Sequence, residues 1–120
     1  MAKILLVEDD LMISRMLSLR LGLKGHDVDL AENGKTGMEK ALASEYDIVL
    51  MDMHMPVMDG HQATTALRDA GYTGLIVAVT ASVMSQESEA ALKSGCDSYI
   101  NKPVSENFEQ EVQEKLDGKL

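Results

Sequence analysis

Short apolar runs alternate with longer segments of helical periodicity along the whole chain. The apolar runs predict five β-strands, because short runs bounded by polar residues are typical of buried strands. The predicted strands are Lys3–Val7, Asp27–Ala31, Asp47–Met51, Leu75–Val79 and Ser98–Asn101. Between and after them, apolar residues at helical spacing predict helices over Leu11–Lys24, Thr36–Ser44, Asp59–Ala70, Ser85–Lys93 and Ser105–Leu116. This alternation predicts an α/β domain with a parallel sheet and helices on both of its faces.

Polar residues of a particular kind follow four of the predicted strands. They are Glu8, Asp9 and Asp10 after the first strand, Asp52 after the third, Thr80 after the fourth and Lys102 after the fifth. The carboxyl ends of parallel strands lie along one edge of a sheet, so we expect these side chains to converge there. Carboxylates that lie close together repel one another unless a cation neutralises them, and oxygen-only ligation favours Mg²⁺. A metal ion, a protruding carboxylate, a hydroxyl and an ammonium indicate a phosphoryl-transfer site.

Topology points to the same place. In an open parallel sheet, ligands bind beyond the carboxyl ends of the strands, at the point where the strand order reverses. In the order 2-1-3-4-5 that point lies between the first and third strands, which precede Asp9, Asp10 and Asp52. Taken one at a time, these residues also have simpler interpretations. Asp9 and Asp10 could cap the following helix, and Lys102 could be a surface lysine.

Composition narrows the class of protein. A chain of 120 residues fits one domain with a single core. With 11 Lys plus Arg and 20 Asp plus Glu, the net charge of −9 argues against direct nucleic-acid binding and fits protein partners. The single cysteine, Cys96, rules out an internal disulfide and favours a reducing compartment. The first apolar run is too short for a signal peptide, and no stretch approaches the roughly 20 apolar residues of a membrane span. We therefore expect a cytoplasmic protein without membrane insertion.

Four segments carry distinctive sequences in a fixed order. They are Ile4-Leu5-Leu6-Val7-Glu8-Asp9-Asp10, Asp47-Ile48-Val49-Leu50-Met51-Asp52-Met53-His54-Met55-Pro56-Val57-Met58-Asp59-Gly60, Thr80-Ala81 and Tyr99-Ile100-Asn101-Lys102-Pro103. In this order and spacing they resemble the receiver domain of two-component response regulators. The resemblance covers essentially the whole chain, residues 1–120, and includes no output domain. It implies a single flavodoxin-like (βα)5 domain with a five-stranded parallel sheet of order 2-1-3-4-5.

The resemblance implies a role for each residue at the strand ends. Asp52 matches the phosphoacceptor, which takes a phosphoryl group from a histidine kinase or a histidine phosphotransfer protein. Asp9 and Asp10, together with Asp52 and the backbone carbonyl of His54, match the ligands of Mg²⁺. Lys102 matches the lysine that pairs with the phosphoryl oxygens. A carboxylate attacks phosphorus only when the repulsion between the two anions is reduced, and the metal ion and the lysine both do this.

The resemblance also implies residues that change conformation on phosphorylation and residues that set the lifetime of the phosphorylated state. Thr80 matches the hydroxyl that moves to contact the phosphoryl group, and Tyr99 matches the aromatic residue that turns inward with it. The side chains of His54 and Ser82 match positions that tune the lifetime of the phosphorylated state. The output is expected to be a changed surface around the fourth helix, the last strand and the last helix, which a downstream protein target reads. Such a protein catalyses only its own phosphorylation and dephosphorylation.

Other functions stay open on the sequence alone. A Mg²⁺-dependent phosphohydrolase with an aspartate nucleophile has similar chemistry, but it often carries a second aspartate two residues after the nucleophile, where this chain has His54. A flavin-binding protein of the same fold needs a hydroxyl- and glycine-rich phosphate loop after the first strand, where this chain has acidic residues. Within the receiver family, the chain could be a free single-domain regulator or the receiver module of a hybrid sensor histidine kinase.

Overall fold

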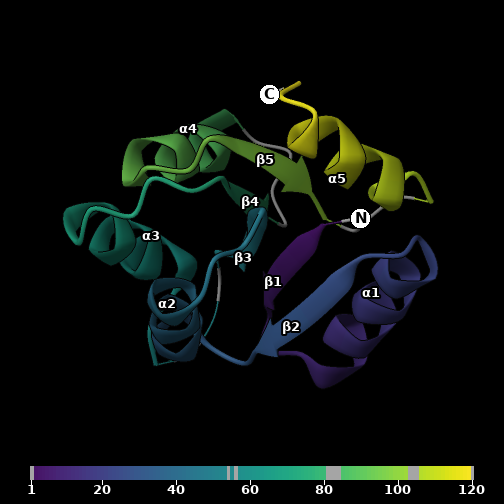
Figure 1. Cartoon of the computed structure of the whole chain (residues 1–120). Coiled ribbons are helices and arrows are strands. Elements are labelled where there is room, and N and C mark those ends of the chain that lie inside the picture. Colours follow the sequence, from purple (N-terminus) through teal and green to yellow (C-terminus); the bar gives the residue numbers. More distant parts are fainter. Residues whose placement is uncertain (1, 54, 56, 81–84, 103–105, 120) are drawn as a thin grey trace.

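The structure of the chain is a computed structural model that describes residues 2–53, 55, 57–80, 85–102 and 106–119. Strands and helices alternate as the sequence predicts (Figure 1). They are β1 (Lys3–Val7), α1 (Leu11–Leu23), β2 (Asp27–Ala31), α2 (Gly34–Ala43), β3 (Ile48–Asp52), α3 (Gly60–Asp69), β4 (Ile76–Thr80), α4 (Ser85–Ser94), β5 (Ser98–Asn101) and α5 (Phe108–Leu116). None of these described helices is long and apolar enough to cross a membrane.

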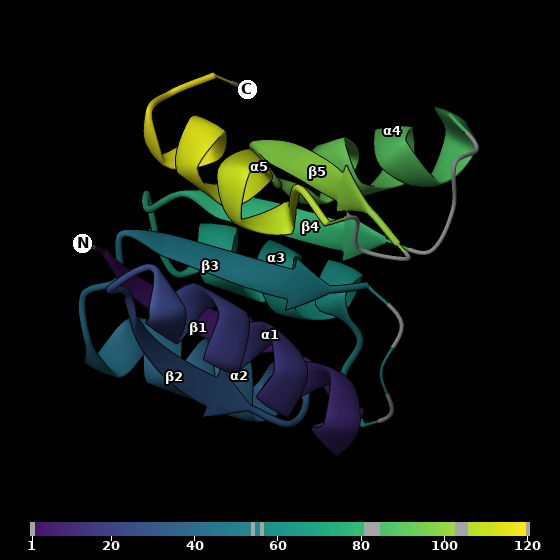
Figure 2. The same ribbon diagram turned by 90° about the vertical axis from the view of Figure 1, so that its right-hand side faces the viewer.

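The five strands form one parallel sheet in the order β2-β1-β3-β4-β5, which confirms the predicted order. Val7, the last residue of β1, lies opposite Ala31 of β2 and Met51 of β3. All neighbouring strands pair in parallel, so their carboxyl ends lie along one edge, and Figure 2 shows the arrowheads of β3, β4 and β5 pointing toward the same side of the molecule. The strand order reverses at β1, so the carboxyl ends of β1 and β3 flank the position where ligands bind in sheets of this kind.

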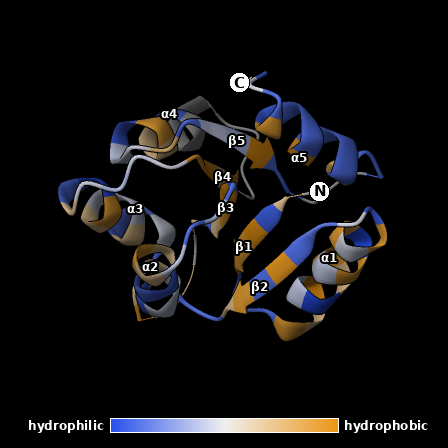
Figure 3. Cartoon of the chain, viewed as in Figure 1, coloured by the Kyte–Doolittle hydropathy of each residue, from blue (hydrophilic) through white to orange (hydrophobic). Residues whose placement is uncertain are grey.

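Helices cover both faces of the sheet. Helices α1 and α5 lie on one face, where Leu17 and Phe108 pack against the strands. Helices α2, α3 and α4 lie on the other face, where Ala41, Leu67 and Ala91 are buried. Figure 3 shows apolar residues concentrated on the strands, whereas α5 is largely hydrophilic. Burial of a leucine or phenylalanine side chain contributes about 1.5–3 kcal/mol, so these two cores hold the strand ends in place.

Several element boundaries differ from the prediction by one to three residues. Helix α2 begins at Gly34 instead of Thr36, because the side chain of Asn33 accepts a hydrogen bond from the Thr36 amide and caps the helix. Strand β3 includes Asp52, which was expected just beyond it. Helix α5 begins at Phe108, and the predicted cap, Ser105, lies outside the described residues.

Helix α1 carries more apolar residues than the core can accept. Leu17 and Leu21 are buried, but four large apolar residues at helical spacing, Met12, Met16, Leu19 and Leu23, are exposed. A surface helix usually presents charged residues on its outer face. The exposed stripe on α1 is therefore a feature that packing within the domain does not explain.

Candidate functional site

Three carboxylates meet at the carboxyl end of the sheet. Glu8 and Asp9 follow β1, and Asp52 ends the neighbouring strand β3. One carboxylate oxygen from each of the three lies within 4.8 Å of the others. Glu8 and Asp52 are each 4% exposed, whereas Asp9 is exposed. Three negative charges so close together, two of them buried, need a positive partner.

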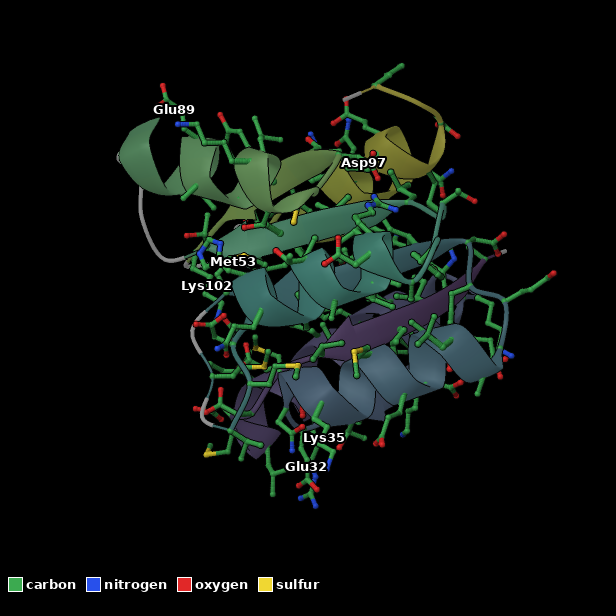
Figure 4. All side chains as sticks on the ribbon, turned by 90° about the vertical axis from the view of Figure 1, so that its left-hand side faces the viewer. Glu32, Lys35, Met53, Glu89, Asp97 and Lys102 are labelled. Atoms are coloured by element: carbon green, nitrogen blue, oxygen red, sulfur yellow. The ribbon has the colours of Figure 1, made fainter. Side chains whose placement is uncertain are left out.

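Lys102 supplies one positive charge to this group. Its Nζ lies 3.0 Å from Oε1 of Glu8 and 3.2 Å from Oδ1 of Asp52. Its backbone N–H donates to the carbonyl of Thr80 at 2.7 Å, which extends the β4–β5 pairing and directs the side chain across the sheet edge. Burial alone would lower the pKa of Lys102, but the hydrogen bond with Glu8 and the charges of Asp52 and Glu8 outweigh it and raise the pKa. Figure 4 shows Lys102 and Met53 at this end of the sheet and Asp97 at the opposite end.

The charge balance leaves room for a divalent cation. Three carboxylates and one ammonium sum to −3 + 1 = −2 at the site. Desolvation at the site raises the pKa of Asp9, and the hydrogen bond with Glu8 and the negative charge of Glu8 add to this rise. The donors are all oxygen atoms, as a hard cation such as Mg²⁺ prefers. The residues present therefore fit a magnesium ion.

The structure places Asp10 differently from the sequence-based expectation. Asp10 is the N-cap of α1, and its Oδ1 accepts hydrogen bonds from the amides of Met12 at 2.9 Å and Ile13 at 3.1 Å. The carboxylate that joins Asp9 and Asp52 is that of Glu8. A helix that starts at Leu11 has Asp10 as its N-cap. The predicted helix start could therefore have indicated Glu8 and Asp9, instead of Asp9 and Asp10, as the acidic pair of the site.

Thr80 and Tyr99 occupy neighbouring strands. Thr80 ends β4 and is fully buried, and its partner in the sheet is Asn101. Tyr99, two residues before Asn101 on β5, is 37% exposed, so part of this residue is open to solvent. His54 and Ser82, the two residues expected to tune phosphate lifetime, lie outside the described residues.

The first residue of α3 rests on the backbone of Asp52. A Cβ atom on Gly60 would lie 2.2 Å from the Asp52 carbonyl oxygen, which no real side chain tolerates. The Gly60 amide donates to the carbonyl of Met53 at 3.3 Å. Asp59 and Gln62 form a capping box that fixes the start of the helix. The glycine thus lets α3 approach the strand that carries Asp52.

Comparison with known proteins agrees with this geometry. The family model of the response regulator receiver domain matches residues 4–113. The chain is 42% identical over 111 residues to the two-component response regulator ORR41 of Oryza sativa subsp. japonica, covering 88% of this chain and 86% of that protein. It is 43% identical over 107 residues to hybrid signal transduction histidine kinase G of Dictyostelium discoideum. That match covers 85% of this chain but only 3% of the kinase, so here the chain corresponds to a small part of a much longer protein.

Solved structures share the fold over nearly the whole chain. The receiver domain of the sensor histidine kinase PA1611 from Pseudomonas aeruginosa PAO1 has a TM-score of 0.87 and 31% identity, covering 98% of each chain, and carries a magnesium ion in its active-site cleft. The receiver domain of Ssk1 from Saccharomyces cerevisiae, in complex with the histidine phosphotransfer protein Ypd1, has a TM-score of 0.84 and 27% identity, covering 95% of this chain and 85% of that one.

Proposed function

This chain belongs to the response regulator receiver domain family of two-component signalling, and from this premise we propose that Asp52 is its phosphoacceptor. The proposal rests on the position of Asp52. It ends the central strand β3, is buried beside Glu8, and lies 3.2 Å from the Lys102 ammonium. An incoming phosphoryl group would meet a positive charge on one side and the acidic group on the other.

The transfer forms a bond between a carboxylate oxygen of Asp52 and phosphorus and breaks the phosphorus–nitrogen bond of a phosphohistidine. The electron pair of the broken bond stays on the imidazole, which leaves after taking up a proton. In this step Lys102 pairs with the phosphoryl oxygens and Thr80 donates a hydrogen bond to one of them. Hydrolysis by water later returns the Asp52 carboxylate and inorganic phosphate.

We propose that Glu8, Asp9 and Asp52 hold the magnesium ion, with the backbone carbonyl of His54 as a further ligand. When bound, Mg²⁺ offsets negative charge on the phosphoryl group. Asp10, which the sequence predicted as a further ligand of the metal ion, is the N-cap of α1 in the structure. The magnesium ion in the PA1611 receiver domain supports this assignment.

Phosphorylation places about two negative charges next to Thr80. We propose that the Thr80 hydroxyl then moves toward the phosphoryl group and that the ring of the partly exposed Tyr99 turns inward. Tyr99 lies on β5, between α4 and α5, so its motion would change the surface formed by these three elements. A downstream protein would read the changed surface. The side chains of His54 and Ser82 would set how long it persists.

The phosphodonor is proposed to be a histidine kinase or a histidine phosphotransfer protein. The complex of the histidine phosphotransfer protein Ypd1 with the receiver domain of Ssk1 supports this proposal. Helix α1 supports a protein donor. It starts beside Asp9, exposes an apolar stripe that includes Met12 and Met16, and contains two arginines and no acidic residue in a chain of net charge −9. A helix with a complementary apolar and acidic surface would dock there and bring its phosphohistidine to Asp52.

The remaining assignments follow from the receiver function. The chain would act only on its own phosphorylation and dephosphorylation, in the cytoplasm, and without direct contact to nucleic acid, as its net charge of −9 favours. The chain fits either a free regulator or a receiver module of a hybrid kinase, because its relatives include proteins of both kinds.

Intact mass after incubation with acetyl phosphate and Mg²⁺ tests the proposal. One added phosphate on the wild-type protein is expected, with none on Asp52→Asn and none when EDTA removes the metal. Phosphate on Asp52→Asn would assign the acceptor to another residue. Turnover of p-nitrophenyl phosphate by the protein, with no stable mass increase, would favour the phosphohydrolase instead.

A further inference from the structure

Helix α4 has little apolar anchoring among its described side chains. Of residues 89–94, Ala91 is the only one that is fully buried, while Leu92 is 44% exposed. Glu89 projects from the outer surface of the helix (Figure 4). Little apolar surface is therefore buried over residues 89–94, so individual polar contacts have a large influence on the position of this part of α4.

Helix α3 makes those polar contacts from one face. Three of its side chains, spaced three and four residues apart, reach the end of α4 and the turn that follows. The pairs are His61 Nδ1 with Ser94 Oγ at 2.9 Å, Thr64 Oγ1 with Cys96 Sγ at 3.7 Å, and Arg68 Nε with the Gly95 carbonyl at 2.9 Å. Among these three pairs only the first involves a residue of α4 itself, so it joins the last turn of α4 directly to α3.

The direction of this hydrogen bond is set by a second one. The Ser94 hydroxyl donates to the carbonyl of Ala90 at 2.9 Å. A hydroxyl has one proton, so the Nδ1–H of His61 is the donor to Ser94 Oγ. The contact therefore joins the imidazole of α3 to the last turn of α4 through a side chain that is already fixed to the backbone.

His61 follows the glycine that rests on the candidate phosphoacceptor. Gly60 approaches the backbone of Asp52 so closely that a Cβ atom would lie 2.2 Å from the Asp52 carbonyl oxygen. A short physical connection thus runs from Asp52 through Gly60 and His61 to Ser94. It is separate from the β4–β5 edge that carries Thr80 and Tyr99.

We propose that the His61–Ser94 hydrogen bond is a latch that holds α4 against α3 in the unphosphorylated protein and opposes the change of the α4 surface. The regulatory half of this inference rests on the proposed receiver function. A contact made in the resting arrangement and lost in the phosphorylated one shifts the equilibrium toward rest. A hydrogen bond of ordinary strength corresponds to about a three- to tenfold shift.

Hydrogen–deuterium exchange of the metal-free protein tests the latch without any phosphate. His61→Ala and Ser94→Ala should each speed amide exchange over residues 89–94 by about three- to tenfold, and the double variant should add little to either. Thr65→Ala is the matched control, because Thr65 is an exposed residue of the same helix. Unchanged exchange in the single variants, or independent effects in the double variant, would overturn the latch.

Affinity for beryllium trifluoride in the presence of Mg²⁺ tests the regulatory half. His61→Ala should bind this phosphoryl mimic about three- to tenfold more tightly than wild type, since the resting arrangement has lost a stabilising contact. Equal affinity together with faster exchange would reduce the pair to a packing contact and overturn its regulatory role. Failure of the wild-type protein to bind the mimic or to accept phosphate would count against the receiver chemistry of Asp52, while the exchange result would still decide the latch.

Discussion

The Nζ atom of Lys102 lies 3.0 Å from Oε1 of Glu8, across 94 residues of sequence. The pair joins the end of β5 to the end of β1, on either side of β3 and β4. The Glu8 side chain is 4% exposed and that of Lys102 is 21% exposed, so water screens the two charges only partly. Because Lys102 also reaches Asp52, the ion pair holds the ammonium beside the proposed phosphoacceptor.

The first prediction concerns Glu8 as a ligand of the metal. Glu8→Gln keeps the size of the side chain but removes one of the three negative charges, so Mg²⁺ should bind about tenfold more weakly. The measurement is the rise in Tm with Mg²⁺ concentration, which reports the dissociation constant through linkage. Glu32→Gln is the matched control, since Glu32 is exposed and lies outside the acidic group. An unchanged Mg²⁺ affinity in Glu8→Gln would contradict the assignment.

Two variants of Asp10 distinguish a role as the cap of α1 from a role as a metal ligand. Asp10→Ala should destabilise the protein by about 1 kcal/mol through loss of the α1 cap, whereas Asp10→Asn should be nearly neutral because asparagine caps equally well. Urea unfolding gives both values, and a Mg²⁺ titration of Asp10→Asn gives the second readout. If Asp10→Asn loses as much Mg²⁺ affinity as Glu8→Gln, Asp10 is a ligand, as its place in the sequence first indicated.

The sequence was sufficient to predict the fold and the convergence of Asp9, Asp52 and Lys102, because both depend on position along strands. Once the strand ends are known, a parallel sheet brings residues after β1, β3, β4 and β5 to one edge, and this requires no knowledge of side-chain packing. Glu8 and Asp10 show where that reasoning stops. Which of three consecutive acids turns toward the site depends on where β1 ends and on which residue caps α1, and these are decided by backbone geometry over one or two residues. The contact of His61 with Ser94 depends on packing between helices, which local pattern does not contain.

Tyr46 gives stability a dependence on alkaline pH. Its hydroxyl donates to Oδ2 of Asp29 at 2.7 Å, and burial together with this contact raises the pKa of Tyr46 to about 12. In the unfolded chain the pKa is about 10, so the folded state keeps the proton where the unfolded state loses it. The contribution of Tyr46 to stability is therefore complete below about pH 10 and is lost as the pH rises toward 12. The stability gap between wild type and Tyr46→Phe in urea unfolding should narrow over this range, and a constant gap would contradict the prediction.

Val57 adopts an unfavourable backbone conformation next to the site. Its φ is +72°, in the left-handed region that β-branched residues avoid, and its side chain is 81% exposed, so no core contact offsets the strain. Val57→Gly should stabilise the protein by roughly 0.5–1 kcal/mol, because relief of strain exceeds the added freedom of the unfolded chain. Val57→Ala keeps a Cβ atom and should gain less. A lower Tm for Val57→Gly than for wild type would show that the strain is smaller than the freedom that glycine adds to the unfolded chain, and would contradict the prediction.

Gly60 should be the glycine least able to accept a side chain, because it lies where α3 approaches the end of β3. The Cβ atom of Gly60→Ala would lie 2.2 Å from the Asp52 carbonyl oxygen and 2.8 Å from the Cα of Met53, both backbone atoms that cannot rotate away. Either α3 retreats or β3 shifts, at a cost of roughly 1–3 kcal/mol, and both displace Asp52 relative to Lys102. Gly60→Ala should therefore lower both the free energy of unfolding and the rate of phosphorylation by acetyl phosphate. Gly22→Ala is the matched control, because a Cβ atom at Gly22 meets nothing within 4 Å and alanine favours the α1 helix, so it should be neutral or stabilising. A Gly60→Ala protein as stable and as rapidly phosphorylated as wild type would mean that α3 can move without disturbing Asp52, and the connection from Asp52 to His61 would fail with it.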